Sequence, residues 1–131
     1  MKITLRLALF SLLLCAPAQA QDKQGFDKRD VEVADALICD TQEQVERYIA
    51  LYNGDQEAAV RAVNREENDP RACGVISAAF VRGPHIGAAS HGNMAFEIVR
   101  ILVVGVYRSG GVRAVEPAPQ FAAFGVTEYG V

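Results

Sequence analysis

The residues best suited to chemistry lie close together in the second half of the chain, where His85, Ser90 and His91 fall within residues 83–93. Imidazole binds zinc and copper and acts as a general base, and a serine hydroxyl is a common nucleophile. The two histidines are six residues apart, which is not the i, i+4 spacing of helical zinc sites, and no third ligand lies beside them. We interpret them as exposed loop side chains, with a metal site completed by a distant Asp or Glu as the alternative.

Nucleophilic catalysis requires a nucleophile, a base and an orienting group within mutual reach. Ser90 and His91 are neighbours in sequence only, and no G-x-S-x-G motif surrounds the serine. The paired acids Glu66 and Glu67 lack apolar neighbours that would raise a pKa, so they are typical of a solvated surface. The sequence therefore predicts no cofactor and no catalytic residue, and it favours a non-enzymatic protein.

The first twenty residues have the three parts of a secretory signal peptide. Lys2 and Arg6 supply positive charge, residues 7–14 form an apolar run, and Ala18 and Ala20 occupy the two positions that signal peptidase reads. The apolar run of about eight residues is far below the roughly twenty that span a bilayer. We predict cleavage after residue 20, and an exported product that is periplasmic or secreted.

Cys15 raises the alternative of a bacterial lipoprotein, because a cysteine after an apolar run can be acylated. The residue before it is Leu14, where lipoproteins need a small side chain. Ordinary cleavage therefore fits better, and we expect no stable membrane insertion of the mature chain.

Two cysteines, Cys39 and Cys73, remain after cleavage. An even number of cysteines in a protein bound for an oxidising compartment predicts a disulfide. A redox or metal-binding pair is the alternative. It is less favoured, because the chain has no C-x-x-C motif and two thiols alone are an incomplete zinc site.

These residues must be positioned by one domain, which we assign to residues 31–131 after a flexible lead-in at 21–30. Overlapping capping boxes in residues 40–44 and apolar residues at helical spacing up to Tyr52 predict one helix. A second helix is expected from Asp55 to the Asn68-Asp69-Pro70 stop, which completes a helical hairpin.

Extended patterns flank the helical region. The expected strands are 31–39, 75–81, 94–107, 112–115 and 125–129, with residues 83–93 as a loop and Pro117 and Pro119 interrupting the ladder. This order predicts an α+β fold in which a helical hairpin is followed by a small antiparallel sheet of three to five strands. A Src-homology-3-like barrel with a helical insertion is the second topology.

Charge limits the range of partners. The whole chain has a formal net charge of −3 and no cluster of lysines or arginines. Nucleic acid and anionic membrane surfaces are poor partners for such a chain.

Several short motifs resemble those of small uncharacterised exported proteins of bacteria. The motifs are Ile38-Cys39-Asp40-Thr41, Glu43-Gln44-Val45, Ala62-Val63-Asn64, Ala72-Cys73-Gly74 and Phe80-Val81-Arg82-Gly83. The resemblance covers about half of the mature chain. It implies pairing of the two cysteines and implies no activity.

The sequence favours an exported envelope protein that binds a protein, a peptide or a cell-wall component. The glycine- and proline-rich segments 83–93 and 116–121 are the expected recognition loops, because loops on a rigid scaffold commonly carry binding residues. The alternative is a small metal-dependent or hydrolytic enzyme centred on residues 83–93. A third hypothesis is an oligomeric structural component.

Overall fold

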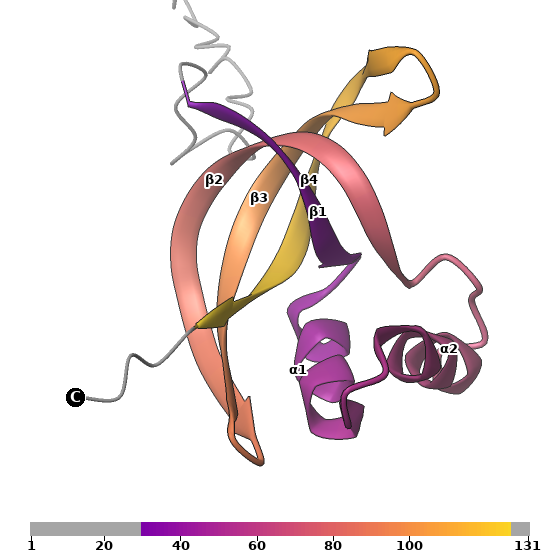
Figure 1. Cartoon of the computed structure of the whole chain (residues 1–131), viewed down its shortest axis with the longest axis vertical. Coiled ribbons are helices and arrows are strands. Elements are labelled where there is room, and N and C mark those ends of the chain that lie inside the picture. Colours follow the sequence, from indigo (N-terminus) through magenta and orange to yellow (C-terminus); the bar gives the residue numbers. More distant parts are fainter. Residues whose placement is uncertain (1–29, 127–131) are drawn as a thin grey trace, which may run out of the picture.

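The structure is a computed structural model and describes residues 30–126. The predicted signal peptide, the predicted lead-in and the end of the last predicted strand lie outside the described residues. The elements, in chain order, are β1 (Val31–Cys39), α1 (Gln42–Leu51), α2 (Gln56–Glu66), β2 (Cys73–His91), β3 (Met94–Arg108) and β4 (Gly111–Val126). The predicted α+β class is confirmed, with the helical hairpin inserted between the first two of four strands (Figure 1).

The four strands form a closed antiparallel barrel in the order β1-β2-β3-β4. β1 pairs along its whole length with the first part of β2, and β3 pairs with β2 and β4 along most of its length, whereas the closing pair is short. Leu37–Cys39 of β1 pair with Phe121–Ala123 of β4. A Src-homology-3-like topology stays a prediction, since a closed barrel alone does not identify it.

Side-chain alternation divides the apolar residues between the inside and the outside of the barrel. The interior holds Phe80 and Ile101, both fully buried, and Ile38, which is nearly so. Every strand contributes to this interior cluster, which comprises Ala36, Ile38, Ala78, Phe80, Val99, Ile101, Val103 and Ala122.

The helical hairpin covers one outer face of the barrel and forms a second core there (Figure 1). Tyr48 and Ile49 of α1 are 1% exposed, and Val63 of α2 is fully buried. They pack on outward-facing residues such as Leu37 and Ile98. The helices therefore depend on the barrel for burial, because short isolated helices are marginal in water. No helix among the described residues is long and apolar enough to cross a membrane.

The helix starts follow the predicted capping residues. Thr41 caps α1 and accepts from the backbone N–H of Gln44, whose side chain bonds back to the cap, so this capping box is confirmed. Asp55 caps α2 by accepting from the N–H of Ala58 at 3.0 Å. Arg47 makes a two-bond ion pair with Glu66 of α2, with both distances 2.8 Å, and this pair ties the helices together.

The predicted loop over residues 83–93 is wrong, because β2 continues to His91 and turns into β3 through Gly92 and Asn93. In this part of β2 the register with β3 shifts twice, between Arg82 and His85 and again between His85 and Gly87. Each shift inserts one extra residue into β2, which is a β-bulge. Pro84 is tolerated there because β1 pairs with β2 only as far as Val81, which leaves this part of β2 at an edge.

β4 continues past both prolines, so the predicted end of the strand at residue 115 is wrong, whereas the predicted interruption of the ladder is found at Pro117 but not at Pro119. β4 runs from Gly111 to Val126, and its register with β3 shifts between Val103 and Gly105. Pro117 lies in the stretch that this irregularity leaves out of register. Gly105 lies at this irregularity, where a Cβ would lie only 2.8 Å from Cγ1 of Val112.

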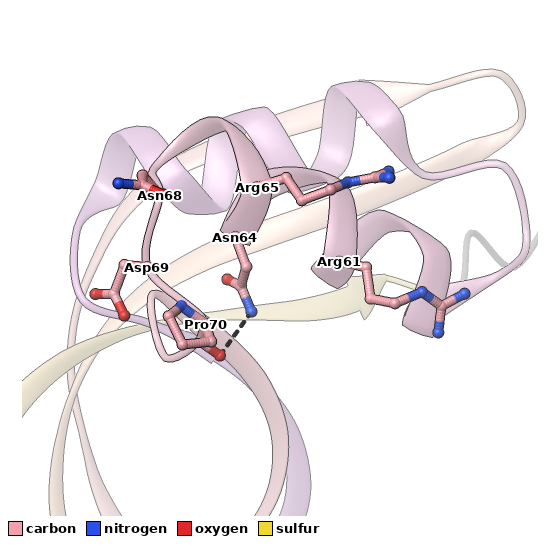
Figure 2. A pocket seen from close by; sticks show the side chains of 6 residues that line it. All are labelled: Arg61, Asn64, Arg65, Asn68, Asp69 and Pro70. Carbon is pink, nitrogen blue, oxygen red and sulfur yellow. Dashed lines mark hydrogen bonds between the residues drawn. The ribbon is translucent and has the colours of Figure 1, made fainter.

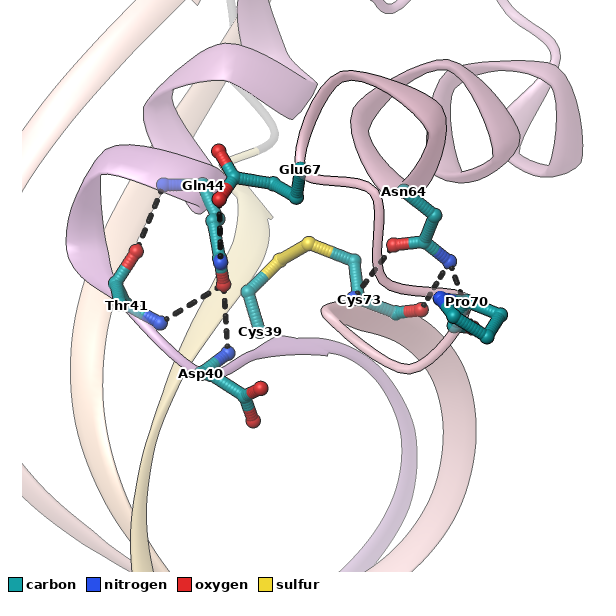
Figure 3. The surroundings of a disulfide bond; sticks show 8 residues. All are labelled: Cys39, Asp40, Thr41, Gln44, Asn64, Glu67, Pro70 and Cys73. Carbon is teal, nitrogen blue, oxygen red and sulfur yellow. Dashed lines mark hydrogen bonds between the residues drawn. A yellow bond between two sulfur atoms is a disulfide. The ribbon is translucent and has the colours of Figure 1, made fainter.

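A clasp joins the ends of β1 and β2 where the helical hairpin leaves and returns to the barrel (Figure 3). Cys39 and Cys73 are partners in the β1–β2 register and form the predicted disulfide, with their Cα atoms 4.1 Å apart. The bond closes a loop with a sequence separation of 34 residues. Restricting the unfolded chain in this way stabilises the fold by about 4 kcal/mol.

Two buried or partly buried amides complete the clasp. Asn64 of α2 accepts from the N–H of Cys73 at 2.8 Å and donates to the carbonyls of Pro70 and Cys73. Gln44 of α1 accepts from the backbone N–H groups of Asp40 and Thr41, each at 3.1 Å. Together they satisfy the backbone of both connections between the barrel and the helices.

The substitution Asn64→Asp should destabilise the protein by about 2 kcal/mol or more. It keeps the acceptor for Cys73 but replaces a donor by an oxygen that faces two carbonyls. Urea unfolding measures the change. Asn53→Asp is the matched control, because Asn53 is exposed and only its side-chain oxygen is used, as acceptor for the N–H of Asp55. Equal loss in both variants would contradict the role of the Asn64 amide.

Tyr48 should make the protein lose stability at alkaline pH. Burial, followed by the charge of Tyr52, raises the pKa of Tyr48 from 10.0 to about 12. Below pH 10 both the folded and the unfolded chain keep the proton. Between pH 10 and 12 the unfolded chain releases it first, so the free energy of unfolding falls, by on the order of 2 kcal/mol. Urea unfolding from pH 9 to 12 should show a weaker fall in Tyr48→Phe, and an unchanged fall in the control Tyr107→Phe, whose ring is 53% exposed.

Candidate ligand-binding site at the barrel mouth

One end of the barrel is closed by stacked side chains. The rings of Phe80 and Phe124 lie 5.9 Å apart between centroids, and the guanidinium of Arg82 lies 3.9 Å from the centroid of the Phe124 ring. Arg82 also donates to both carboxylate oxygens of Glu32, at 2.9 and 3.0 Å. This cation–π and ion-pair arrangement covers the interior at that end.

The opposite end of the barrel opens into a pocket of about 440 Å³, which we call the barrel-mouth pocket. This volume lies within the range of small-molecule sites. The pocket is lined by residues from all four strands and from the α2–β2 connection: Ile38, Asp40, Pro70, Arg71, Ala72, Cys73, Gly74, Ile76, Ala78, Val103, Val106, Ala118 and Gln120.

The wall of the barrel-mouth pocket is aliphatic. Ile38, Ala78 and Val103 belong to the buried barrel interior, and Ile76, although 40% exposed, lies on the same side of the sheet. Among the lining residues there is no aromatic ring. The pocket therefore continues the apolar interior of the barrel to the surface and suits a branched or linear hydrocarbon group.

The rim of the barrel-mouth pocket is polar, with Asp40, Gln120 and Arg71. In the amide orientation that satisfies both of its neighbours, Gln120 donates to the carbonyl of Cys39 at 2.9 Å and to Oδ1 of Asp40 at 3.1 Å. Arg71 is exposed, and its guanidinium has no hydrogen bond or ion pair among residues 30–126. The rim therefore carries one guanidinium without a partner among the described residues and one carboxylate that already accepts a hydrogen bond.

The clasp fixes the position of this rim. The N–H of Asp40 donates to the carbonyl of Ala72 at 3.0 Å, directly beyond the disulfide. The N–H of Arg71 donates to the side chain of Asp69 at 2.8 Å. Because both rim segments are tied to the ends of β1 and β2, the pocket entrance is formed before any ligand binds.

The structure brings together only part of the predicted chemical site. His85 and Ser90 line one hollow of about 530 Å³ with Glu97, and Nδ1 of His85 lies 3.7 Å from Oε1 of Glu97. His91 does not line this hollow. Ser90 and His91 are consecutive strand residues, so their side chains point to opposite faces and do not form a serine–histidine pair.

A further hollow of about 450 Å³ lies on α2, beside Asn64, Asp69 and Pro70. Figure 2 shows the side chains of Arg61 and Arg65 extending away from Asp69. Asn64 is already engaged by the clasp. The polar groups do not converge on a common point, so this hollow is a weaker candidate than the barrel-mouth pocket.

Sequence reasoning found one side of the barrel-mouth pocket and missed the rest. Of the two predicted recognition segments, 116–121 contributes Ala118 and Gln120, whereas no residue of 83–93 lines the pocket. The sequence places Ile76 only in the predicted strand 75–81 and Gly74 only in the motif Ala72-Cys73-Gly74. The strand register would have placed both residues at the pocket, because Gly74 pairs with Ile38 beside the disulfide and so lies at this end of the barrel.

The fold and the site define a small disulfide-linked α+β barrel with one plugged end and one open, aliphatic end. No protein-family model, no curated protein and no solved structure matches the chain. The function is therefore argued from the geometry of the site.

We expect tag-free protein to bind zinc no more tightly than micromolar. Within residues 30–126, no group of three or more His, Cys, Asp or Glu side chains is placed to hold a metal ion, and His85 has Glu97 as its only such neighbour. Isothermal titration with zinc and copper measures this. A one-to-one site of sub-micromolar affinity that disappears in His85→Ala would contradict it.

Proposed function

We propose that the protein is a non-enzymatic, exported binding protein that takes part of a protein, a peptide or a cell-wall component into the barrel-mouth pocket. The observation that supports this most directly is the aliphatic wall of the pocket, which runs into the barrel interior between Ile38 and Val103. A concave apolar site with a few polar groups at its edge is typical of ligand recognition.

Export is supported by two independent features. The chain starts with a predicted signal peptide, and Cys39 and Cys73 form a disulfide, which persists in oxidising compartments. The periplasm or the extracellular medium is the proposed location. Mass spectrometry of native protein should give a chain that begins at Gln21; a mass that includes Met1 would contradict this part of the proposal.

A hydrolytic or metal-dependent enzyme centred on residues 83–93 is the second candidate. It is favoured by one observation, which is that His85, Ser90 and Glu97 line the same hollow. A serine nucleophile also needs an oxyanion hole and an oriented base. Loss of an esterase or peptidase activity on replacing both Ser90 and His85 by Ala would favour this candidate over binding alone.

The substitution Ala118→Leu tests the proposed function. The added side chain would occupy the barrel-mouth pocket from β4, where Ala118 is partly exposed and pairs with Val103. We expect it to abolish saturable capture of a component from an envelope extract of the organism that makes the protein. Capture is measured by quantitative mass spectrometry on immobilised, oxidised protein.

The matched control is Ala114→Leu, which carries the same change on the same strand at an exposed position outside the pocket. Both variants should melt within a few degrees of the wild type. Equal capture by wild type and Ala118→Leu would overturn the proposal that this pocket is the binding site.

A further inference from the structure

The charged groups at the rim of the barrel-mouth pocket indicate which polar group the ligand carries, which the apolar wall does not. Asp40 and Arg71 are the two ionic groups that line the pocket. The carboxylate of Asp40 already accepts a hydrogen bond from Gln120, whereas the guanidinium of Arg71 has no partner within the described chain. Of these two groups, only the guanidinium has all of its hydrogen-bond donors unused within the described chain, and the group that a guanidinium binds is an anion.

The groups at the rim also indicate how many negative charges the ligand carries. A guanidinium presents a planar pair of donors that matches a carboxylate or a phosphate. The single guanidinium compensates one negative charge, so a doubly charged phosphate would leave a second negative charge uncompensated beside Asp40, whereas a carboxylate would not. The carboxylate fits better.

We propose that the barrel-mouth pocket recognises an aliphatic carboxylate: a hydrocarbon chain or branch in the pocket, with its carboxylate on Arg71. This inference rests on the proposed function and names the ligand chemistry of the same site. Two sources share that chemistry. One is a fatty acid, and the other is the last residue of a peptide that ends in an aliphatic side chain.

The test is an NMR titration of the oxidised, ¹⁵N-labelled protein with three eight-carbon probes: octanoate, octylammonium and octanol. We expect octanoate to shift the amides of Gly74, Ala78 and Ala118 and to bind at least tenfold more tightly than octylammonium. Octanol should fall between them, because it fills the pocket without an ionic contact.

Arg71→Gln should reduce the affinity for octanoate at least tenfold and leave that for octanol unchanged. The matched control is Arg65→Gln, which removes an exposed arginine of α2 outside the barrel-mouth pocket and should change neither affinity. Octylammonium binding as tightly as octanoate, or undiminished octanoate binding by Arg71→Gln, would overturn the inference.

A second arm separates the two sources. An acetylated Gly-Gly-Leu peptide is compared as free acid and as amide, and binding of the free acid alone supports a peptide C-terminus. Binding of octanoate without either peptide supports a fatty acid. If neither octanoate nor the free-acid peptide binds, the inference is overturned. The proposed function still stands in that case if Ala118→Leu abolishes capture from the envelope extract. If neither probe binds and Ala118→Leu captures as much as the wild type, the inference and the proposed function are both overturned.

Discussion

The register pair Cys39–Cys73 is the constraint on which the rest of the structure depends. The two residues face each other across β1 and β2 and are joined covalently at the point where the chain leaves the barrel for the helices. This one link fixes the strand register, closes the helical hairpin at its base and brings the segments around Asp40 and Arg71 to the same barrel end. The pocket rim is thus a consequence of the clasp.

Much of the fold could be predicted because its signals are local. The caps at Thr41 and Asp55 and the disulfide depend on residue type and spacing, and each is confirmed. The strand at residues 83–91 was missed because glycine and proline favour turns, and only pairing with β3 and two bulges make that segment extended. Tertiary hydrogen bonding overrode local preference there.

The candidate site was harder to predict than the fold, because its residues come together only when the sheet closes into a barrel. Ile76 and Ala118 are far apart in the sequence and meet only when β1 and β4 pair over three residues. Composition had instead pointed to His85 and His91, whose side-chain types suggest chemistry. The alternation of a strand separates Ser90 from His91, and no feature of the sequence alone reveals this without knowing that the segment is extended.

The two ends of the barrel show why only one of them is suited to binding. At the plugged end, Arg82 is held by Glu32 and by the ring of Phe124, so its charge and the apolar interior are both already satisfied. At the open end, the interior meets solvent between Ile76 and Ala118, and the rim arginine Arg71 has no partner among the described residues. An arginine thus covers the barrel interior at one end, whereas the arginine at the other end has no partner among the described residues. A ligand that supplies an apolar group and an anion would complete the open end as Phe124 and Glu32 complete the plugged one.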